Sequence, residues 1–435
     1  MHKASFLILC HIALFIPDSY AQQIWTLQDC IDYAIAHSLT VKRQNNVVKT
    51  TALELNTAKN AFFPTLTGSS YQDFSFGRGL SAENTYTSTD VRTTTFAVVA
   101  ELPIFTGFRI SNTVKLKQHL YNASIMDLQK AEDELQINVI KAYQNVLYKM
   151  EEVAITYRQY HIDSLQSERL RTLVAKGKVS KVELARQISA ESQSKTKNVQ
   201  AGNAVKMSLL TLSQLMELPT PEMLHLSLYS ISVENTYIEK PETVFENAIT
   251  SKAEIKAEEH RVKAFERQIN ISRSSLFPML SLTGGFGTKC YFVSNSYNET
   301  FGRQVRNNIS EYVTLNLTIP IFNRFETRND IRKSKVELYN QHLVLEEKKK
   351  DLYKAIQQAY YTALDAQSNY IACKESSKSA EESLRLVIAK YENGLADITE
   401  YNEAMNTYSE SVSKLTQSKY EFFFAVEILK FYKGN

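Results

Sequence analysis

The chain is poor in the residues that make loops, covalent bridges and metal sites. Its 435 residues include only 8 prolines, 12 glycines and 4 cysteines. So little proline and glycine argues against a loop-rich enzyme and favours long helices. Cys30, Cys290 and Cys373, the cysteines beyond the first 21 residues, are odd in number and far apart. They suit neither a disulfide framework nor a zinc site, and the sequence assigns them no role.

An excess of one charge is also missing. The formal net charge is +3, and acidic and basic residues are interspersed, so no basic footprint for a nucleic acid is present. The 8 histidines have no metal-ligand spacing. We find no nucleophile paired with a base, no P-loop and no dinucleotide-binding fingerprint. The chain is therefore predicted not to be an enzyme, with no cofactor, no metal site and no nucleic-acid partner.

Long apolar runs are absent except near the start. Residues 6–16 form an apolar run of 11 residues, too short to span a bilayer, after the basic residue Lys3. Ser19-Tyr20-Ala21 then offers a small residue at each end. Residues 1–21 are predicted to be a secretory signal peptide that is cleaved after Ala21. The rest of the sequence has no apolar run of ~18 residues, so we predict no transmembrane helix.

What the chain does contain is an internal duplication. Residues 102–105 (Leu-Pro-Ile-Phe) recur 217 residues later as Ile-Pro-Ile-Phe, and Gly177 recurs at the same offset as Gly394. Phe62-Phe63-Pro64 recurs 214 residues later as Leu-Phe-Pro. Such a period is too long for a solenoid. We predict one α–β–β–α unit written twice, with these boundaries: repeat 1 at 22–218, a linker or equatorial segment at 219–240, and repeat 2 at 241–435.

Each repeat contains two predicted strands. Period-two alternation over eight residues predicts a strand with one apolar and one polar face. The clearest case alternates apolar Val313, Leu315, Leu317 and Ile319 with polar Tyr312, Thr314, Asn316 and Thr318. Similar patterns occupy residues 95–102 and 280–287 and, more weakly, 66–76. The polar stretches 77–90 and 289–310 are predicted to be loops between strands.

Helices fill most of the remainder. Short helices are predicted at about 25–37, 40–61, 241–251 and 254–275. Residues 109–173 and 325–392 contain no proline or glycine, so each predicts a rod of about 100 Å at about 1.5 Å per residue. In the second rod, apolar residues from Leu352 to Cys373 follow a 4-3 spacing typical of a coiled coil. Each rod ends at a turn near Gly177 or Gly394, and a return helix follows.

These elements together predict a tube. Strands of ~9–11 residues with alternating faces suit the wall of an outer-membrane barrel. Four strands cannot close a barrel, and an open edge in lipid leaves backbone groups unpaired at several kcal/mol each. The chain must therefore pool its strands with copies of itself, giving 8, 12 or 16 strands for two, three or four copies. We predict an α+β membrane protein whose β-barrel continues into a coiled-coil helical barrel, with polar strand residues lining the lumen.

The chain after residue 21 resembles the TolC-type outer-membrane efflux channel family. The resemblance depends on an ordered, duplicated set of motifs. They are the opening Trp-Thr-Leu-Gln-Asp-Cys-Ile-Asp-Tyr-Ala (25–34), the Phe-Phe-Pro strand entry (62–64), the Pro-Ile-Phe strand exits, and the turns at 177–180 and 394–400. The opening and Ser75-Phe76-Gly77-Arg78 are similar to members from Bacteroidota.

The resemblance implies an assembly and a function. It implies a homotrimer with a 12-stranded barrel in the outer membrane of a Gram-negative bacterium and a 12-helix tunnel in the periplasm. It implies docking to a periplasmic adaptor protein and to an inner-membrane pump, which we expect to be proton-driven. The channel would then be a passive exit duct for small molecules, such as drugs, toxic compounds or metal ions.

The resemblance also points to acidic residues after the second turn. Glu400 and Glu403 are three residues apart and so share a helix face. They match an acidic pair that lines the narrowest part of the tunnel in the family, where copies would form an acidic ring that favours cations. In the first repeat, Glu183 is acidic but Arg186 occupies the second position. The alternative is an ordinary solvated pair on a helix surface.

Other site residues come from the same turns. Tyr391 matches a tyrosine of the family's gate, where a hydrogen bond to a neighbouring helix would hold the gate shut, although a packing role is an alternative. Asp397 falls where the family has a basic gate partner. The candidates for adaptor docking are Lys176, Gly177, Lys178, Asn393, Gly394 and Leu395. Glycine at these turns is needed in any case, because a positive φ ends the helix there.

Two alternatives to small-molecule efflux stay open. The same duct would serve type I protein secretion, because the pump and not the duct selects the cargo. An exported coiled-coil scaffold, with its strands in a soluble cap, is a different class. The four alternating strands argue against this scaffold, because a soluble cap needs no lipid-facing band.

Overall fold

The computed structural model describes residues 24–80, 84–88, 90–227, 237–294 and 296–434. The predicted signal peptide (1–21) lies outside these ranges, as does the centre of the predicted linker (228–236). Among the described residues, no helix combines the length and the apolar character that crossing a bilayer would require.

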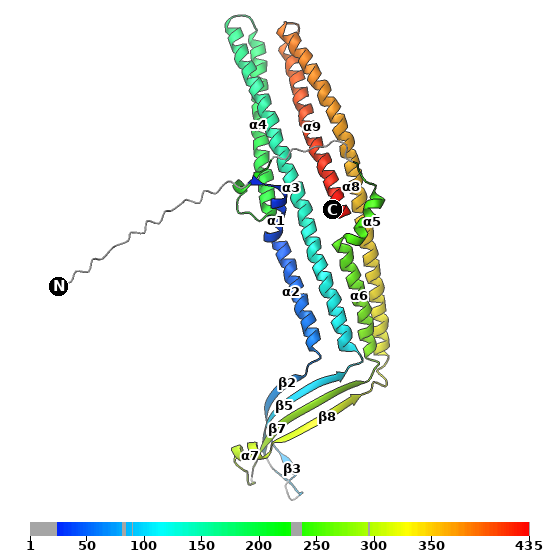
Figure 1. Ribbon diagram of the computed structural model, residues 1–435. Helices are drawn as coiled ribbons and strands as arrows, with labels where there is room; N and C mark the ends of the chain where they lie inside the picture. Colours follow the sequence, from blue (N-terminus) through cyan, green and yellow to red (C-terminus); the bar gives the residue numbers. More distant parts are fainter. Residues whose placement is uncertain (1–23, 81–83, 89, 228–236, 295, 435) are drawn as a thin grey trace, which may run out of the picture.

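Helices and strands occupy opposite ends of a long molecule (Figure 1). Two helices of 67 residues, α3 (Arg109–Ala175) and α8 (Glu326–Glu392), run from the sheet to the far end. At about 1.5 Å per residue each is about 100 Å long, as the absence of proline and glycine predicts. The molecule is therefore a rod with a sheet at one end.

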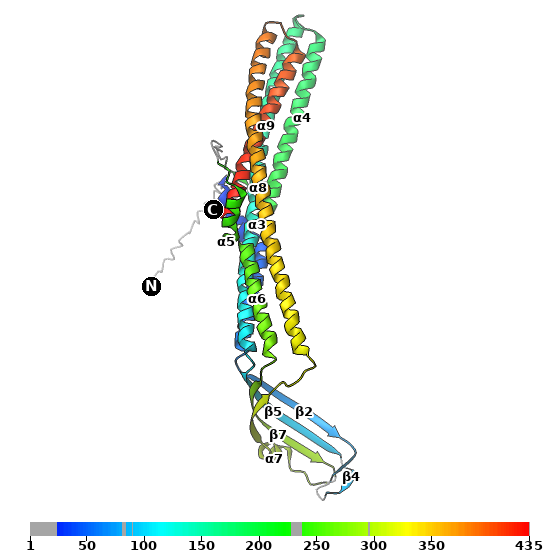
Figure 2. The same ribbon diagram turned by 90° about the vertical axis from the view of Figure 1, so that its right-hand side faces the viewer.

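The same helical layout occurs twice. Within each long helix, the half far from the sheet pairs with a return helix and the half near the sheet pairs with a shorter helix (Figure 2). The return helices are α4 (Lys181–Leu215) and α9 (Ile398–Lys433); the shorter ones are α2 (Leu39–Asn60) and α6 (Ala253–Ser274). The predicted α+β fold with an internal duplication is confirmed.

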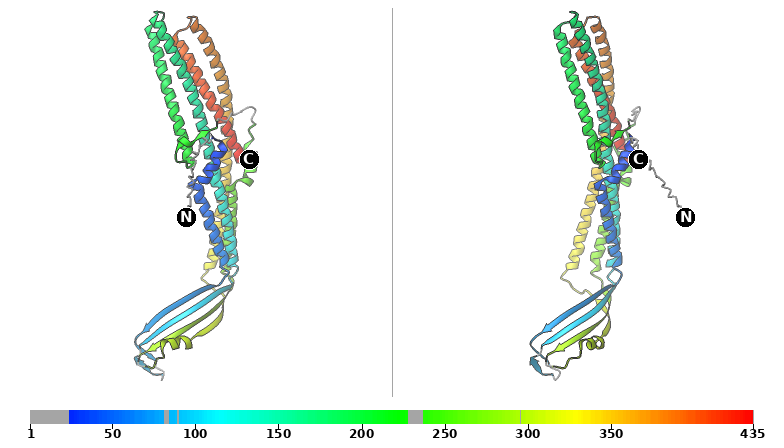
Figure 3. Two further views of the ribbon diagram at one scale, coloured as in Figure 1. Left: turned by 60° about the vertical axis from the view of Figure 1, so that its left-hand side comes forward. Right: turned by 90° about the vertical axis from the view of Figure 1, so that its left-hand side faces the viewer.

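The four predicted strands form one antiparallel sheet with the order β2-β5-β7-β8. The strands are β2 (Thr65–Ser75), β5 (Val91–Phe105), β7 (Met279–Val293) and β8 (Ser310–Thr318). The central pair, β5 and β7, joins the two repeats. The sheet is curved in every view (Figure 3). Within the described part of the chain, β2 and β8 each leave one edge unpaired.

The register sorts side chains onto two faces. One row of neighbours across the sheet is Leu66, Ala100, Gly284 and Val313. The adjacent row, on the opposite face, is Thr65, Glu101, Thr283 and Thr314. We call the first the apolar face and the second the polar face. On the polar face, the amide of Asn316 donates a hydrogen bond of 3.2 Å to Thr283.

Aromatic residues mark the passage from strand to helix. Phe108 and Phe325, just before α3 and α8, have left-handed backbones with φ of 64° and 63°. Their rings pack edge-on against Phe105 and Phe322, with centroids 5.2 Å and 5.4 Å apart. Gly107 is also left-handed, and a Cβ there would lie 2.5 Å from the Ser274 carbonyl oxygen, so glycine is required. The second repeat has Arg324 before Phe325, also with a positive φ.

The main hydrophobic core lies at the middle of the rod. There α1 (Leu27–His37) and α5 (Pro241–Ser251) pack against the long helices. Trp25, in the short parallel pair β1 (Ile24–Trp25) and β6 (His225–Leu226), donates from its indole to the Met223 carbonyl at 3.1 Å. Cys30 is fully buried here, and burial raises the pKa of its thiol to about 12, so this cysteine is an inert packing residue.

Two predicted loops contain regular structure, and these predictions were wrong. The stretch 77–90 includes the hairpin of β3 (Arg78–Leu80) and β4 (Tyr86–Ser88). The stretch 289–310 includes the last five residues of β7 and a short helix, α7 (Phe301–Asn307). These elements are too short for a periodic pattern to reveal them.

Candidate gate at the hairpin turns

The two turns at the end far from the sheet have the same backbone geometry. Gly177 and Gly394 have φ of 68° and 73°, and nothing lies within 4 Å of a Cβ built on either. Glycine is therefore required by backbone conformation and not by space. The amide of Lys178 donates to the Leu173 carbonyl and that of Leu395 to the Lys390 carbonyl, each at 2.9 Å. These bonds close equivalent turns.

All six predicted docking residues are exposed at these turns. They are Lys176, Gly177, Lys178, Asn393, Gly394 and Leu395. Leu395 is 77% exposed, which is unusual for a leucine, although single exposed apolar residues occur on many surfaces. The turns therefore present two basic side chains on one hairpin and an apolar one on the other.

Each return helix begins with a side-chain cap. The Ser180 hydroxyl accepts from the Glu183 amide at 3.1 Å. The Asp397 carboxylate accepts from the amides of Thr399 and Glu400 at 2.8 Å and 2.9 Å. The bond from the Glu400 amide is the largest cause that lowers the pKa of Asp397, so the cap stays ionised at neutral pH. The structure thus gives Asp397 a local role in starting α9.

Tyr391 makes the kind of contact that the gate prediction requires. Its hydroxyl accepts a 3.0 Å hydrogen bond from the Gln166 amide, which joins α8 to α3. Its ring lies 5.2 Å from that of Tyr401, beside the buried cluster of Leu170, Leu384 and Ile398. Burial is the main cause that raises the pKa of Tyr391, with a further contribution from Glu183. The hydroxyl therefore stays protonated at neutral pH.

The predicted acidic pair lies on the surface of α9. Glu400 and Glu403 are both exposed within the single chain. Glu400 lies 3.6 Å from the Lys390 ammonium of α8. This ion pair is weak because both side chains are about half exposed. Glu183, the acidic residue of the first repeat, is close enough to Tyr391 to help raise the pKa of that tyrosine.

Arg186 makes a contact that the sequence did not reveal. Its guanidinium donates to the Thr399 hydroxyl at 2.8 Å, which joins α4 to α9, and its charge helps to lower the pKa of Asp397. In the sequence, Arg186 stands out only as an exception to an acidic pattern. Asp397, in the second repeat, occupies a position where the family has a basic residue. Arg186, from the first repeat, places a basic group beside it.

The first hairpin buries a group of polar side chains. Asp163 is only 3% exposed, and it accepts a 3.1 Å hydrogen bond from the Gln159 amide. Gln187 is fully buried and donates to the Asp163 carbonyl at 3.1 Å. Burial is the main cause that raises the pKa of Asp163. The polar residues at 159, 163 and 166 were the signal in the sequence for these buried polar groups. The corresponding positions of α8 have smaller or apolar residues.

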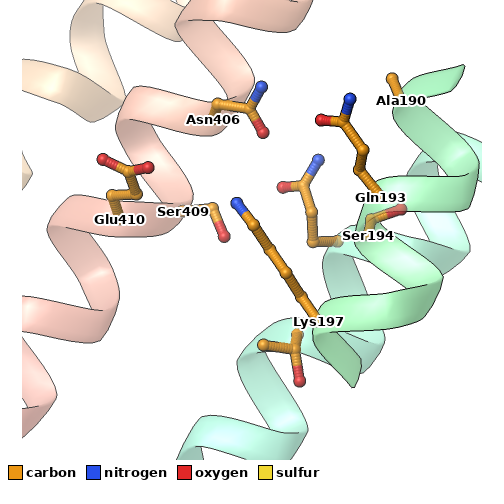
Figure 4. A pocket seen from close by; sticks show the side chains of 9 residues that line it. Ala190, Gln193, Ser194, Lys197, Asn406, Ser409 and Glu410 are labelled. Carbon is orange, nitrogen blue, oxygen red and sulfur yellow. The ribbon is translucent and has the colours of Figure 1, made fainter. Parts of the chain in front are cut away.

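A small polar cleft separates the two hairpins (Figure 4). It has a volume of about 40 Å³ and is lined by α3, α4 and α9. Lys197 of α4 extends towards Ser409 of α9, and Gln193 faces Asn406 across the gap (Figure 4). A water molecule needs about 10–15 Å³, so the cleft has room for solvent between the hairpins. Contact between the hairpins here is therefore polar and incomplete.

The strand residues assigned to lipid and lumen are on opposite faces, as the alternation requires. Val313, Leu315 and Leu317 lie on the apolar face, and Tyr312, Thr314 and Asn316 on the polar face. Thr318 ends β8, and Ile319 follows the strand. Among the described residues, no cluster of three or more His, Cys, Asp or Glu side chains is placed to hold a metal.

Comparisons with known proteins agree with this architecture. A family model described as outer membrane efflux protein matches residues 31–217 and 244–434. The outer membrane efflux protein BepC of Brucella suis is 21% identical over 365 residues, which are 84% of this chain and 75% of BepC.

Solved structures share the fold. A membrane protein from Pseudomonas aeruginosa superposes with a TM-score of 0.79 at 17% identity, covering 94% of this chain and 91% of that protein. The CmeC outer membrane channel of Campylobacter jejuni has a TM-score of 0.78 at 15% identity, covering 94% and 85%. Because the family model matches most of the sequence and these channels share the fold, the chain belongs to the outer membrane efflux protein family, whose members are channels and not enzymes.

Proposed function

We propose that three copies of this chain form the outer-membrane duct of a tripartite efflux system. The duct passes small molecules outward from a proton-driven inner-membrane pump through a periplasmic adaptor. The sheet crosses the outer membrane and the helices extend into the periplasm. Family membership supports an efflux channel, since BepC is an outer membrane efflux protein and CmeC is an outer membrane channel.

The observation that carries this proposal is the incomplete sheet. Four strands present one apolar and one polar face, and β2 and β8 leave their outer edges unpaired within the described residues. In lipid, an unpaired edge costs several kcal/mol for each backbone group. Pairing β8 of one copy with β2 of the next removes both edges. Three copies then give a 12-stranded barrel.

The two faces then have different surroundings. Val313, Leu315, Leu317 and Ile319 contact lipid, while Tyr312, Thr314, Asn316 and Thr318 line the lumen. Val313 is 78% exposed in the single chain, as a lipid-facing residue would be before insertion. The polar face also carries Glu101, which in lipid would be costly. With this assignment, the apolar side chains face lipid and the polar side chains face the aqueous lumen.

The helical end supplies the gate. Glu400 and Glu403 from each copy form an acidic ring that favours cations, and Glu183 lies close to it. Tyr391 with Gln166, and Arg186 with Thr399, hold the second hairpin against the first. Asp397 acts through Arg186, whose charge it faces. The exposed turns around Gly177 and Gly394 dock the adaptor.

The test is single-channel recording from the purified protein in planar bilayers. Discrete cation-selective steps that lose their selectivity in Glu400→Ala/Glu403→Ala would support both the duct and its acidic ring. The matched control is Glu346→Ala/Glu347→Ala, which removes the same charge far from the turns. Unchanged selectivity in the first variant would keep the channel and reject the ring. Verified insertion without any current, even in a Tyr391→Phe/Arg186→Met variant, would reject the duct.

The cargo needs a separate experiment. Deleting the gene should sensitise its host to small toxic compounds and leave its exported proteins unchanged. The opposite pattern, a missing exported protein with normal sensitivity, would instead indicate type I secretion through the same duct. No change in either, together with silent bilayers, would favour the exported scaffold.

A further inference from the structure

The short helix α7 is built onto the sheet. Beyond the end of β8, the Gln304 side chain, which is 9% exposed, bonds to the backbone of β7 in the place of a neighbouring strand. It accepts from the Tyr291 amide at 2.7 Å and donates to the Tyr291 carbonyl at 2.9 Å. Asn308 donates to the Lys289 carbonyl at 2.7 Å. This helix is therefore fixed in place and closes a gap in the wall.

The same helix covers the end of the apolar face. The ring of Phe301 packs against Phe96, with centroids 6.4 Å apart. Beside it lies a hollow of about 460 Å³, and most of its lining is apolar. The residues that define this apolar hollow are Gly68, Phe96, Val98, Phe286, Val305 and Ile309. A face that contacts lipid thus has a recess there that an acyl chain fits.

A second hollow, of about 370 Å³, lies beyond Phe301 towards the end of the sheet. Its floor is a row of three neighbours across the strands, Phe74, Arg92 and Phe292. The Arg92 guanidinium carbon is 5.9 Å from the Phe74 ring and 5.5 Å from the Phe292 ring. Within the described residues Arg92 has no ion pair, and its side chain is exposed. We call this hollow the Arg92 cleft.

The Arg92 cleft suits a phosphate group. Aromatic rings beside a guanidinium hold it by cation–π attraction and leave its in-plane N–H donors free. Those donors match the geometry of phosphate oxygens, which they bind in pairs. Glu299 also lines this cleft, and Arg303 of α7 lies 4.0 Å from it and offsets part of its charge. Arg92 is the basic residue in the lining of the cleft, at the end of an apolar surface.

The depth of Arg92 fits a lipid headgroup. From Phe105 to Phe96, β5 spans 10 residues, and a strand of ~9–11 residues crosses the hydrocarbon core. Arg92 lies four residues further, in the headgroup region. Since the proposed function places the helices in the periplasm, this is the outer leaflet. We propose that the Arg92 cleft and the apolar hollow together bind a phosphate-bearing lipid of the outer leaflet, with its phosphate on Arg92 and an acyl chain beside Val305.

The test measures lipid that stays on the full-length mature protein. Nanodiscs of phosphatidylethanolamine are doped with lipid A or with dephosphorylated lipid A, and bound lipid is counted by native mass spectrometry after gentle extraction. We expect wild type to retain lipid A, and Arg92→Gln to lower its apparent affinity about tenfold or more, because charge-assisted hydrogen bonds are lost. Arg92→Lys should also lose affinity, because an ammonium cannot pair two phosphate oxygens.

The control is Arg328→Gln. Arg328 also lies over a phenylalanine, 5.3 Å from the Phe325 ring, but at the other end of the sheet. Equal retention by wild type and Arg92→Gln would overturn the proposal, and so would an equal loss in Arg328→Gln. Competition by inorganic phosphate alone, as strong as by lipid A, would show a free-phosphate site and reject the lipid. Currents recorded from the same preparations separate this from failure of the duct, because Arg92 lies on the apolar face.

Discussion

The first hairpin, α3 with α4, and the second, α8 with α9, share length and turn geometry but bury different side chains. Positions 217 residues apart in the sequence compare as follows: Asp163 with Ala380, Ser167 with Leu384, and Gln187 with Ala404. The first hairpin is joined inside by a directional hydrogen bond from Gln187 of α4 to the Asp163 carbonyl of α3. The second is packed by the apolar cluster around Leu384 and Ile398, to which Leu170 of the first hairpin also belongs. One duplicated unit has therefore reached two solutions to helix pairing.

The difference has consequences for movement. Hydrogen bonds fix one register, whereas apolar packing is non-directional and has no preferred partner atoms. Some polar groups of the first hairpin stay without a partner among the described residues, including the Ser167 hydroxyl and the Gln187 side-chain oxygen. These polar groups therefore fix how the helices of the first hairpin pair, but they lower its free energy of unfolding. We expect the second to be the part that is released when the polar contacts between hairpins break.

The largest expected effect comes from making the second hairpin resemble the first. Leu384→Ser should lower the free energy of unfolding by about 2–5 kcal/mol, because it removes a buried side chain and leaves a cavity. Thermal unfolding followed by circular dichroism measures the change. Leu386→Ser, on the same helix at a side chain that is 50% exposed, is the control and should have little effect. Equal losses in both variants would contradict the comparison.

The next effect concerns the contact between hairpins. Tyr391→Phe removes the hydroxyl that accepts from Gln166 and should favour the open gate by about 1 kcal/mol in each copy. That is about fivefold in the closed-to-open equilibrium. Open probability in planar bilayers measures it. Tyr408→Phe is the control, because Tyr408 packs against the same cluster but its hydroxyl makes no hydrogen bond among the described residues. An unchanged open probability in Tyr391→Phe would remove Tyr391 from the gate.

A smaller effect tests the buried acid of the first hairpin. Because burial raises the pKa of Asp163, its carboxyl stabilises the fold fully only below its unfolded pKa. That contribution is lost as the pH rises through the folded pKa. Asp163→Asn should therefore raise the thermal midpoint at pH 7 relative to wild type, and the difference should shrink on acidification to pH 4. A variant that is less stable than wild type at pH 7 would show that the charged form is the stabilising one.

The smallest effect is a single hydroxyl. Ser167→Ala removes an oxygen that is buried without a partner, so stability should stay equal or rise by up to about 1 kcal/mol. Ser124→Ala is the control, because the Ser124 hydroxyl is 2.8 Å from both the Thr51 hydroxyl and the Tyr121 carbonyl. It should lose about 1 kcal/mol. If both variants change stability by the same amount, hydrogen-bond partners do not determine how much each hydroxyl contributes to stability.

Local signals in the sequence predicted most of the fold. Glycine and proline mark the ends of α3 and α8, and alternation marks the strands, since both are properties of a few neighbouring residues. The contacts of Gln166 with Tyr391 and of Arg186 with Thr399 join residues 225 and 213 positions apart. They depend on how long helices rotate against each other, which no local pattern encodes. The helix α7 escaped for another reason, because seven residues with one glycine carry no periodic signal.

The chain carries both copies of the repeated unit in one polypeptide, and β5 of the first copy pairs with β7 of the second. In a ring built from separate single units, every substitution would appear at every hairpin, so neighbours could not differ. With two units in one chain, a substitution appears only at every second hairpin. Neighbouring hairpins can then differ in sequence and in role. The polar interior around Asp163 and the apolar interior around Leu384 are the result of that freedom. Joining both units in one chain therefore allows neighbouring hairpins of the proposed tube to differ from each other.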